Sequence, residues 1–149
     1  MEVVTINSSG LPQIIAAVKY AASHKGSIAA ILCQEHHRRE EGLADMQAAT
    51  RALGWKTTGV AAVTGAGGGA SAGVAAITAT HVPSGAQDGI PIDGAPKGSE
   101  GRLLSVWVQK VVPCGVLLQS AYFHTNEGPS PRNVQLLIKW GTLAARGRL

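Results

Sequence analysis

The stretch that decides the fold is SIAAILCQE, residues 27–35. It is short and apolar as far as Cys33, and it follows directly on a segment with apolar residues at helical spacing, 11–24. Such a run is typical of a strand that is buried on both faces. The segment VVTIN, residues 3–7, precedes that helix and is rich in β-branched residues. If the two strands pair in parallel, Asn7 and Glu35 lie at the same edge of the sheet.

The remaining segments continue this pattern and then change it. Apolar residues at helical spacing predict two further helices, at 43–54 and from about 130 to 145. Runs of β-forming residues predict four more strands, at 55–64, 74–82, 101–112 and 116–124. A loop rich in Gly and Pro is predicted over 83–100. Because helical crossovers come first and hairpins later, we expect an α/β (α+β) fold, a mixed β-sheet with helices on one face.

The composition indicates one folded domain without a membrane span. The chain has 149 residues, of which 45% are apolar, 15% are charged and only 4% are aromatic. The core must therefore consist mainly of Val, Ile, Leu and Ala. No uncharged apolar run reaches the length of about 18 residues that crosses a bilayer, and no signal peptide opens the chain. The two cysteines, Cys33 and Cys114, lie in apolar stretches without a CxxC motif, which favours free thiols and an intracellular location.

The excess of positive over negative charge lies at the end of the chain. The net charge is +4, and no acidic residue follows Glu127. Three basic residues, Arg132, Lys139 and Arg146, are spaced by seven and share one face of the predicted last helix. This face is a candidate for binding nucleic acid, and the alternative is an ordinary solvated helix face.

Two predicted strand ends carry the polar residues with the clearest chemical potential. Open α/β sheets place ligands at the carboxyl ends of their strands, so Glu35 is a candidate ligand of a hard divalent cation. The alternative is an ordinary acid at a strand end. The neighbouring His36 and His37 cannot both face one metal from regular structure, so they are weak evidence for zinc. Tyr122 and His124 are two residues apart and face one side of a strand, unless they are a core tyrosine and a solvated histidine.

A glycine-rich segment offers a competing interpretation. Residues 65–70, GAGGGA, match the pattern G-x-G-x-x-A that cradles a dinucleotide. That function needs a helix to begin at the motif, whereas the following residues are β-branched and lack a helical stripe. A hairpin connection is the alternative that these residues favour.

Six short segments, in the right order, resemble the endonuclease/exonuclease/phosphatase superfamily of metal-dependent phosphodiesterases, which includes abasic-site and retrotransposon endonucleases. TINSSGL resembles the W-N-x-x-G-L start of this family, and CQE resembles its L-Q-E motif. The segments SAGVA, EGR and SAY are similar to its G-G-V-A, E-G-R and V-Y motifs. Residues 132–140 resemble its R-x-x-x-L-L-x-x-W helix.

The resemblance implies a fold, a cofactor and roles for individual residues. Residues 1–149 would form a partial domain of this family, half of a four-layer α/β sandwich. Glu35 would bind Mg²⁺, with Mn²⁺ as the alternative, and Asn7 would orient the catalytic centre. Tyr122 would lie against the scissile phosphate, and His124 is a further catalytic candidate. The implied reaction is metal-assisted attack of water on a phosphodiester bond of nucleic acid.

The chain also departs from the family. The G-D-x-N strand and the late S-D-H segment are missing, since no Asp follows Asp93 and no His follows His124. We therefore expect a truncated phosphodiesterase-like domain, with a non-catalytic remnant or interaction module as the alternative and a nucleotide-binding domain as the last one. In the family two sheets pack face to face, and we expect these strands to supply only one. Its inner apolar face would then drive self-association, through Val74, Ala76, Leu104, Val106 and Leu117.

Overall fold

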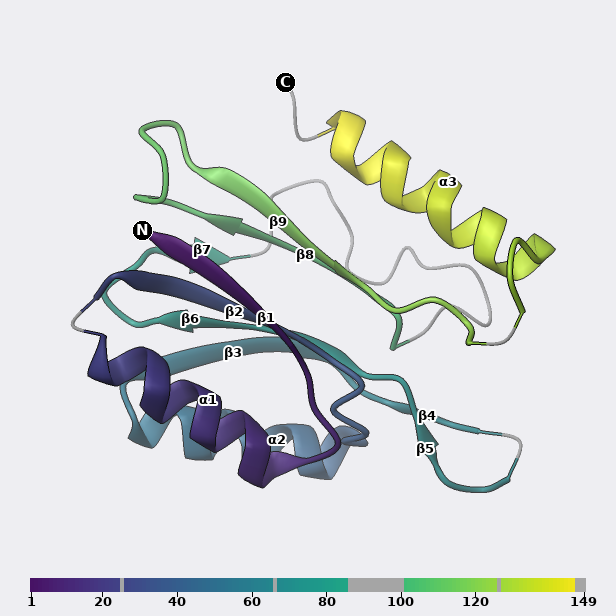
Figure 1. Cartoon of the computed structure of the whole chain (residues 1–149), viewed down its shortest axis with the longest axis horizontal. Coiled ribbons are helices and arrows are strands. Elements are labelled where there is room, and N and C mark those ends of the chain that lie inside the picture. The colour runs from purple at the N-terminus through teal and green to yellow at the C-terminus, as the bar shows by residue number, and fades with distance from the viewer. Residues whose placement is uncertain (25, 66, 86–100, 126, 147–149) are drawn as a thin grey trace.

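The computed structural model describes residues 1–24, 26–65, 67–85, 101–125 and 127–146 (Figure 1). The greater part of the predicted loop, 86–100, lies outside these residues. Within these described residues the helices are α1 (Leu11–Ser23), α2 (Glu40–Ala52) and α3 (Pro131–Arg146). The long strands are β1 (Glu2–Asn7), β2 (Ile28–Gln34), β3 (Trp55–Val60), β6 (Val74–Ala79), β8 (Leu103–Val108) and β9 (Val116–Ala121). Three short strands are β4 (Val63–Thr64), β5 (Ala70–Ser71) and β7 (Ser84–Gly85).

The first sheet is mixed, as predicted, with the strand order β1-β2-β6-β3. Strand β1 runs parallel to β2, and β6 runs antiparallel to both of its neighbours. Helices α1 and α2 cover one face of this sheet (Figure 1). The interface is apolar and closed, because Ile14, Val18 and Met46 of the helices and Ile31 and Ile77 of the sheet are at most 1% exposed.

The helix boundaries follow local chemistry. Pro12 occupies the first turn of α1, where its missing N–H leaves no hydrogen bond unmade. Helix α2 begins at Glu40, three residues before the predicted start at 43. Glu40 and Glu41 lie in its first turn, where negative charge is stabilised by the helix dipole. The apolar periodicity that predicted this helix does not extend over these two residues.

A second sheet faces the first, and our expectation that the chain supplies only one sheet was wrong. This second sheet has the order β7-β8-β9 and lies across the face of the first sheet that the helices leave open (Figure 1). Val74 and Ala76 point into the space between the sheets from β6, as do Leu104 and Val106 from β8, and all four are at most 3% exposed. A hydrogen bond of 3.0 Å from Gln34 Nε2 to Ser120 Oγ joins the two sheets.

The chain therefore contributes to four layers (Figure 1). Helices α1 and α2 together form the first layer, the two facing sheets form the second and third, and α3 forms the fourth beyond the second sheet. Helix α3 buries Leu136 and Asn133 on its inner side. On its outer side it exposes Val134, Leu137 and Ile138, at 40%, 49% and 64%. Among the described residues, exposed large apolar side chains thus gather on α3, and others, Met1, Val3, Tyr20 and Val112, lie elsewhere. No described helix is long and apolar enough to cross a membrane.

Candidate functional site

The site is built where the parallel strands β1 and β2 end. Asn7 lies opposite Gln34 in the parallel register, and Glu35 follows directly. The Asn7 Nδ2 atom donates a hydrogen bond of 3.0 Å to Glu35 Oε1. This contact confirms the prediction that the two residues meet at one edge of the sheet. Glu35 has a φ of 56°, a left-handed conformation that is uncommon for a residue other than glycine.

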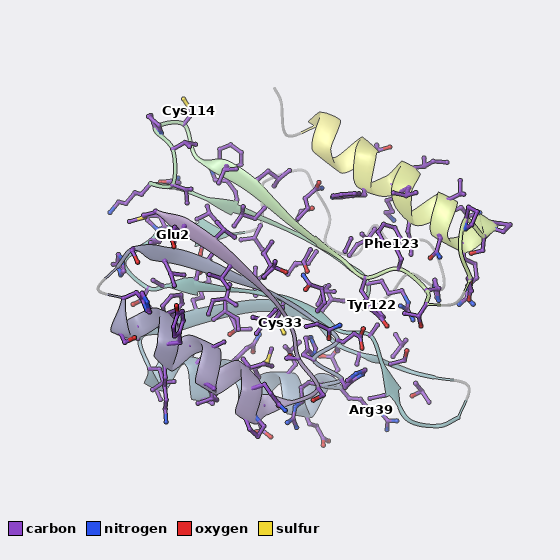
Figure 2. All side chains as sticks on the ribbon, in the orientation of Figure 1. Glu2, Cys33, Arg39, Cys114, Tyr122 and Phe123 are labelled. Carbon is purple, nitrogen blue, oxygen red and sulfur yellow. The ribbon has the colours of Figure 1, made fainter. Side chains whose placement is uncertain are left out.

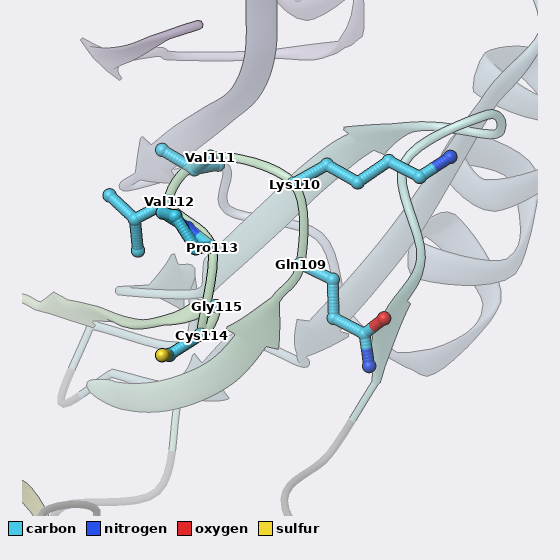
Figure 3. A pocket seen from close by; sticks show the side chains of 7 residues that line it. All are labelled: Gln109, Lys110, Val111, Val112, Pro113, Cys114 and Gly115. Atoms are coloured by element: carbon cyan, nitrogen blue, oxygen red, sulfur yellow. The ribbon is translucent and has the colours of Figure 1, made fainter.

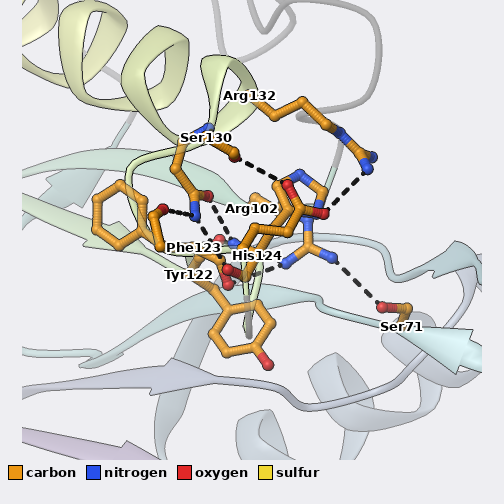
Figure 4. A network of polar contacts seen from close by, with 10 residues as sticks. Ser71, Arg102, Tyr122, Phe123, His124, Ser130 and Arg132 are labelled. Carbon is orange, nitrogen blue, oxygen red and sulfur yellow. Dashed lines mark hydrogen bonds and ion pairs between the residues drawn. The ribbon is translucent and has the colours of Figure 1, made fainter.

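Tyr122 joins this pair from the second sheet. Its side chain points away from α3, toward the first sheet (Figures 2 and 4), and its hydroxyl interacts with the Glu35 carboxylate. Burial raises the pKa of Tyr122, and the interaction with Glu35 raises it further. The phenol therefore stays protonated and is a donor at neutral pH. The three residues Asn7, Glu35 and Tyr122 are called the edge site below.

Arg102 holds Tyr122 in place, a role that the sequence did not reveal beyond the EGR resemblance. Its guanidinium carbon lies 5.0 Å from the centre of the Tyr122 ring, a cation–π distance. The same guanidinium donates to the main-chain oxygens of Tyr122 and Phe123, both at 3.4 Å, and to Ser71 Oγ (Figure 4). Burial lowers the pKa of Arg102, while the nearby carboxylates of Glu35 and Glu127 raise it.

His36 supports the site from beneath and is not a metal ligand. Its side chain is fully buried, its Nδ1 accepts a hydrogen bond from the Arg38 N–H at 3.0 Å, and its Nε2 lies 3.2 Å from Val60 O. Since Nδ1 is the acceptor, the ring is the neutral tautomer that donates from Nε2. Burial lowers the pKa of His36 to about 4. Both ring nitrogens serve the loop that carries Glu35, which explains why no metal role fits this histidine.

Gly73 lets the buried imidazole of His36 approach the main chain. The glycine has a φ of 89°, and a Cβ there would lie 2.5 Å from Cε1 of the ring. Two backbone hydrogen bonds fix the same loop, from the His36 N–H to Gly73 O and from the His37 N–H to Ala72 O. The loop 35–37 is therefore held by β2, by the turn before β6 and by the end of β3.

His37 lies beside the carboxylate oxygen of Glu35 that Asn7 does not contact. Its Nε2 is 3.6 Å from Glu35 Oε2, and its φ of 53° is also left-handed. Throughout the residues that the structure describes, no group of three or more His, Cys, Asp or Glu side chains is arranged to hold a metal. A cation at Glu35 would thus be held by few protein ligands, with water or substrate oxygens completing its shell, which suits an open site.

The structure places His124 in a second polar network, at the start of α3 (Figure 4). Strand β9 ends at Ala121, earlier than the predicted 124, and the chain then turns toward α3. The His124 N–H donates to Asn133 Oδ1 at 2.8 Å, and its Nδ1 lies 3.7 Å from Glu127 Oε1. A catalytic role for His124 stays a prediction.

Of the three basic residues predicted to face nucleic acid, Arg132 is in this same network. Its guanidinium donates to Glu127 at 3.2 Å. Lys139 follows on α3, and the side chain of Arg146 lies outside the described part of the structure. The charges of Glu127, Arg132 and Glu35 all act on the pKa of Arg102, so the network at the start of α3 and the edge site are close enough to interact electrostatically.

The nucleotide-binding interpretation of residues 65–70 is wrong. Val63 and Thr64 pair with Ser71 and Ala70, so this segment is the tip of the hairpin β4–β5 and no helix begins there. A separate hollow of about 690 Å³ lies at residues 109–115, the connection between β8 and β9 (Figure 3). It is at the opposite end of these strands from Arg102 and Tyr122, so it belongs to no part of the edge site.

The comparisons with known proteins support the fold. No family model and no curated protein matches the chain. The crystal structure of the AP endonuclease LMAP from Leishmania major is similar, with a TM-score of 0.54 and 14% sequence identity. The match covers 82% of this chain and 40% of that one, so the chain spans well under half of the length of this neighbour. At this identity the likeness shows an endonuclease-like fold and no more.

Proposed function

We propose that the chain carries the metal-binding and phosphate-facing part of a metal-dependent phosphodiesterase that acts on nucleic acid. The observation that carries the proposal is the convergence of Asn7, Glu35 and Tyr122 from three strand ends, where Asn7 is hydrogen-bonded to Glu35 and Tyr122 interacts with the same carboxylate. The endonuclease-like fold and the six ordered sequence resemblances support it. The two free cysteines are in keeping with an intracellular protein.

The edge site can be assigned roles in this reaction. Asn7 occupies one oxygen of Glu35 and fixes the carboxylate, whose other oxygen can hold Mg²⁺. When bound, such an ion supplies Lewis-acid stabilisation of charge on the phosphate. Tyr122 is a protonated donor that can hydrogen-bond a phosphate oxygen, and Arg102 positions its ring.

The metal proposal is tested by calorimetric titration of Mg²⁺ and Mn²⁺ into the wild type and two variants. Glu35→Gln keeps the shape of the side chain and removes its charge, and it should weaken binding about tenfold or more. Glu41→Gln is the matched control, since Glu41 is an exposed residue in the first turn of α2. Equal affinities for wild type and Glu35→Gln would remove Glu35 from the site and refute the proposed function.

Catalysis by this chain alone is expected to be weak. No Asp follows Asp93 and no His follows His124, so the family residues that orient water and transfer protons have no counterpart in this sequence. General acid–base catalysis typically contributes about 10²–10⁴-fold. Nicking of supercoiled or abasic DNA with Mg²⁺ should therefore be at most a trace rate. Robust nicking that is lost in Glu35→Gln would show that the chain activates water by residues other than those of the family.

The alternative hypothesis, a non-catalytic interaction module, is distinguished from the enzyme hypothesis by the same nicking assay combined with a DNA-binding measurement. If Arg132, Lys139 and Arg146 contact phosphates, the logarithm of the affinity should fall with the logarithm of salt concentration with a slope of about −3. Arg132 would have to exchange its bond to Glu127 for a phosphate. An affinity that does not respond to salt would refute nucleic-acid binding by this helix face.

A further inference from the structure

Besides the contacts of Glu35 with Asn7 and Tyr122, Glu35 and His37 turn one potential ligand atom each toward the other, Oε2 and Nε2. Glu35 Oε2 and His37 Nε2 are 3.6 Å apart, which is too long for a good hydrogen bond. The other oxygen, Oε1, already accepts the bond from Asn7. Both side chains remain reachable from solvent, at 24% and 35% exposure. Two adjacent atoms about 2.1 Å from one octahedral ion are about 3.0 Å apart, so the two side chains would have to approach each other by about 0.6 Å.

The imidazole of His37 is otherwise unused. Its Nδ1 is buried and has no hydrogen-bond partner among the described residues, which is rare for a native side chain. The ring therefore does not owe its place to a structural hydrogen bond. Its polar contact among the described residues is with the carboxylate of Glu35.

The backbone conformation of both residues is unusual and is enforced by their surroundings. Glu35 and His37 both have a left-handed φ, of 56° and 53°, which costs free energy and persists only where the surroundings enforce it. The residue between them, His36, supplies that enforcement through its buried ring and its bond to Gly73. Because His36 is held in place and the residues on both sides of it are left-handed, the side chains of Glu35 and His37 lie on the same side of the loop.

We propose that His37 is the second protein ligand of the cation at Glu35, and that the site prefers Mn²⁺ to Mg²⁺. This inference rests on the proposed function, because it assumes that Glu35 holds a cation. Mg²⁺ takes oxygen ligands and gives up its waters reluctantly, whereas imidazole nitrogen suits first-row transition ions. A carboxylate paired with an imidazole is therefore a donor set for Mn²⁺, with water or phosphate oxygens as the remaining ligands.

The test uses Mn²⁺ itself as the spectroscopic probe. Electron spin echo modulation of the Mn²⁺-loaded wild type should contain a ¹⁴N component from a directly bound imidazole. His37→Asn should abolish that component and weaken Mn²⁺ binding about tenfold or more, while Mg²⁺ affinity changes less than about twofold. Asparagine tolerates the left-handed backbone at this position, so the variant should fold. His81→Asn is the control, because His81 is exposed beyond the far end of β6.

The outcomes separate this inference from the function on which it rests. If Mn²⁺ binding requires Glu35 but the wild type shows no ¹⁴N component, His37 is not a ligand, and the metal site survives without it. If Glu35→Gln binds Mn²⁺ as tightly as the wild type, the metal site itself is refuted. The spectrum of the wild type decides the question even if a variant folds poorly.

Discussion

The buried His36 makes the stability of the protein depend on pH in a definite direction. Burial lowers its pKa to about 4 in the folded state, against about 6.5 in an unfolded chain. Between these two pH values the His36 imidazole is protonated in the unfolded chain and neutral in the folded chain. The stabilisation is thus complete above about pH 6.5 and is lost progressively as the pH falls toward 4. A shift of about 2.5 units corresponds to about 3 kcal/mol in full, and to about 2 kcal/mol between pH 8 and pH 5.

The assay is urea unfolding of the wild type and His36→Gln at several pH values in that interval. All other titrating groups are common to both proteins, so the difference between their pH profiles isolates His36. Glutamine can still donate to Val60 O but does not titrate, and its lower stability at pH 8 does not affect the comparison. The wild type should lose about 2 kcal/mol more than the variant from pH 8 to pH 5. Parallel profiles would refute a buried neutral His36 and the support that it gives to the loop of Glu35.

Three further predictions address the support, the geometry and the outer surface of the fold. Gly73→Ala should destabilise the protein by about 2–4 kcal/mol, because its Cβ would meet the His36 ring at a positive φ, whereas Gly67→Ala, with nothing within 4 Å, should change stability by less than about 0.5 kcal/mol in urea unfolding. In ultraviolet titration, Tyr122 should ionise above the ordinary tyrosine value near 10, at a lower pH in Glu35→Gln, and an unmoved titration would contradict the interaction of these two side chains. Light scattering should show self-association of the wild type that Ile138→Glu reduces without loss of stability, since Ile138 is 64% exposed on α3; a wild type that is monomeric at high concentration would contradict this.

The sequence predicted the part of the fold that depends on local periodicity and connection rules. The run 27–35 and the helix before it determined the strand β2, and a parallel pairing with β1 was enough to bring Asn7 to Glu35. Nothing beyond two neighbouring strand ends was needed, so this part of the site was predictable from the order of elements.

The second sheet was not predictable in this way. Alternation along β8 correctly separated the face with Leu104 and Val106 from the face with Leu103 and Ser105. The alternation could not show which surface covers the face with Leu104 and Val106. An apolar stripe has the same period whether it packs on another sheet of the same chain or stays uncovered. The facing of β8 and β9 onto β2 and β6 is decided by tertiary packing.

The support of the site was also invisible in the sequence. His36 owes its role to Gly73 and Val60, which lie far along the chain, and Arg102 owes its role to the ring of Tyr122. A pair of adjacent histidines gives no signal that one is buried and the other faces a carboxylate. The left-handed conformations of Glu35 and His37, which separate these roles, have no marker in residue type.

Paramagnetic broadening locates the proposed cation at Glu35, beside Asn7 and Tyr122. Substoichiometric Mn²⁺ is added to ¹⁵N-labelled protein, and the loss of each amide signal reports its distance from the bound ion. With an ion at the edge site, we expect the amide signals of Asn7, Glu35 and Tyr122 to broaden first, while those of Cys114 and Ile138 persist. Broadening centred on another acidic surface, such as the first turn of α2, or no selective broadening, would contradict the proposed site.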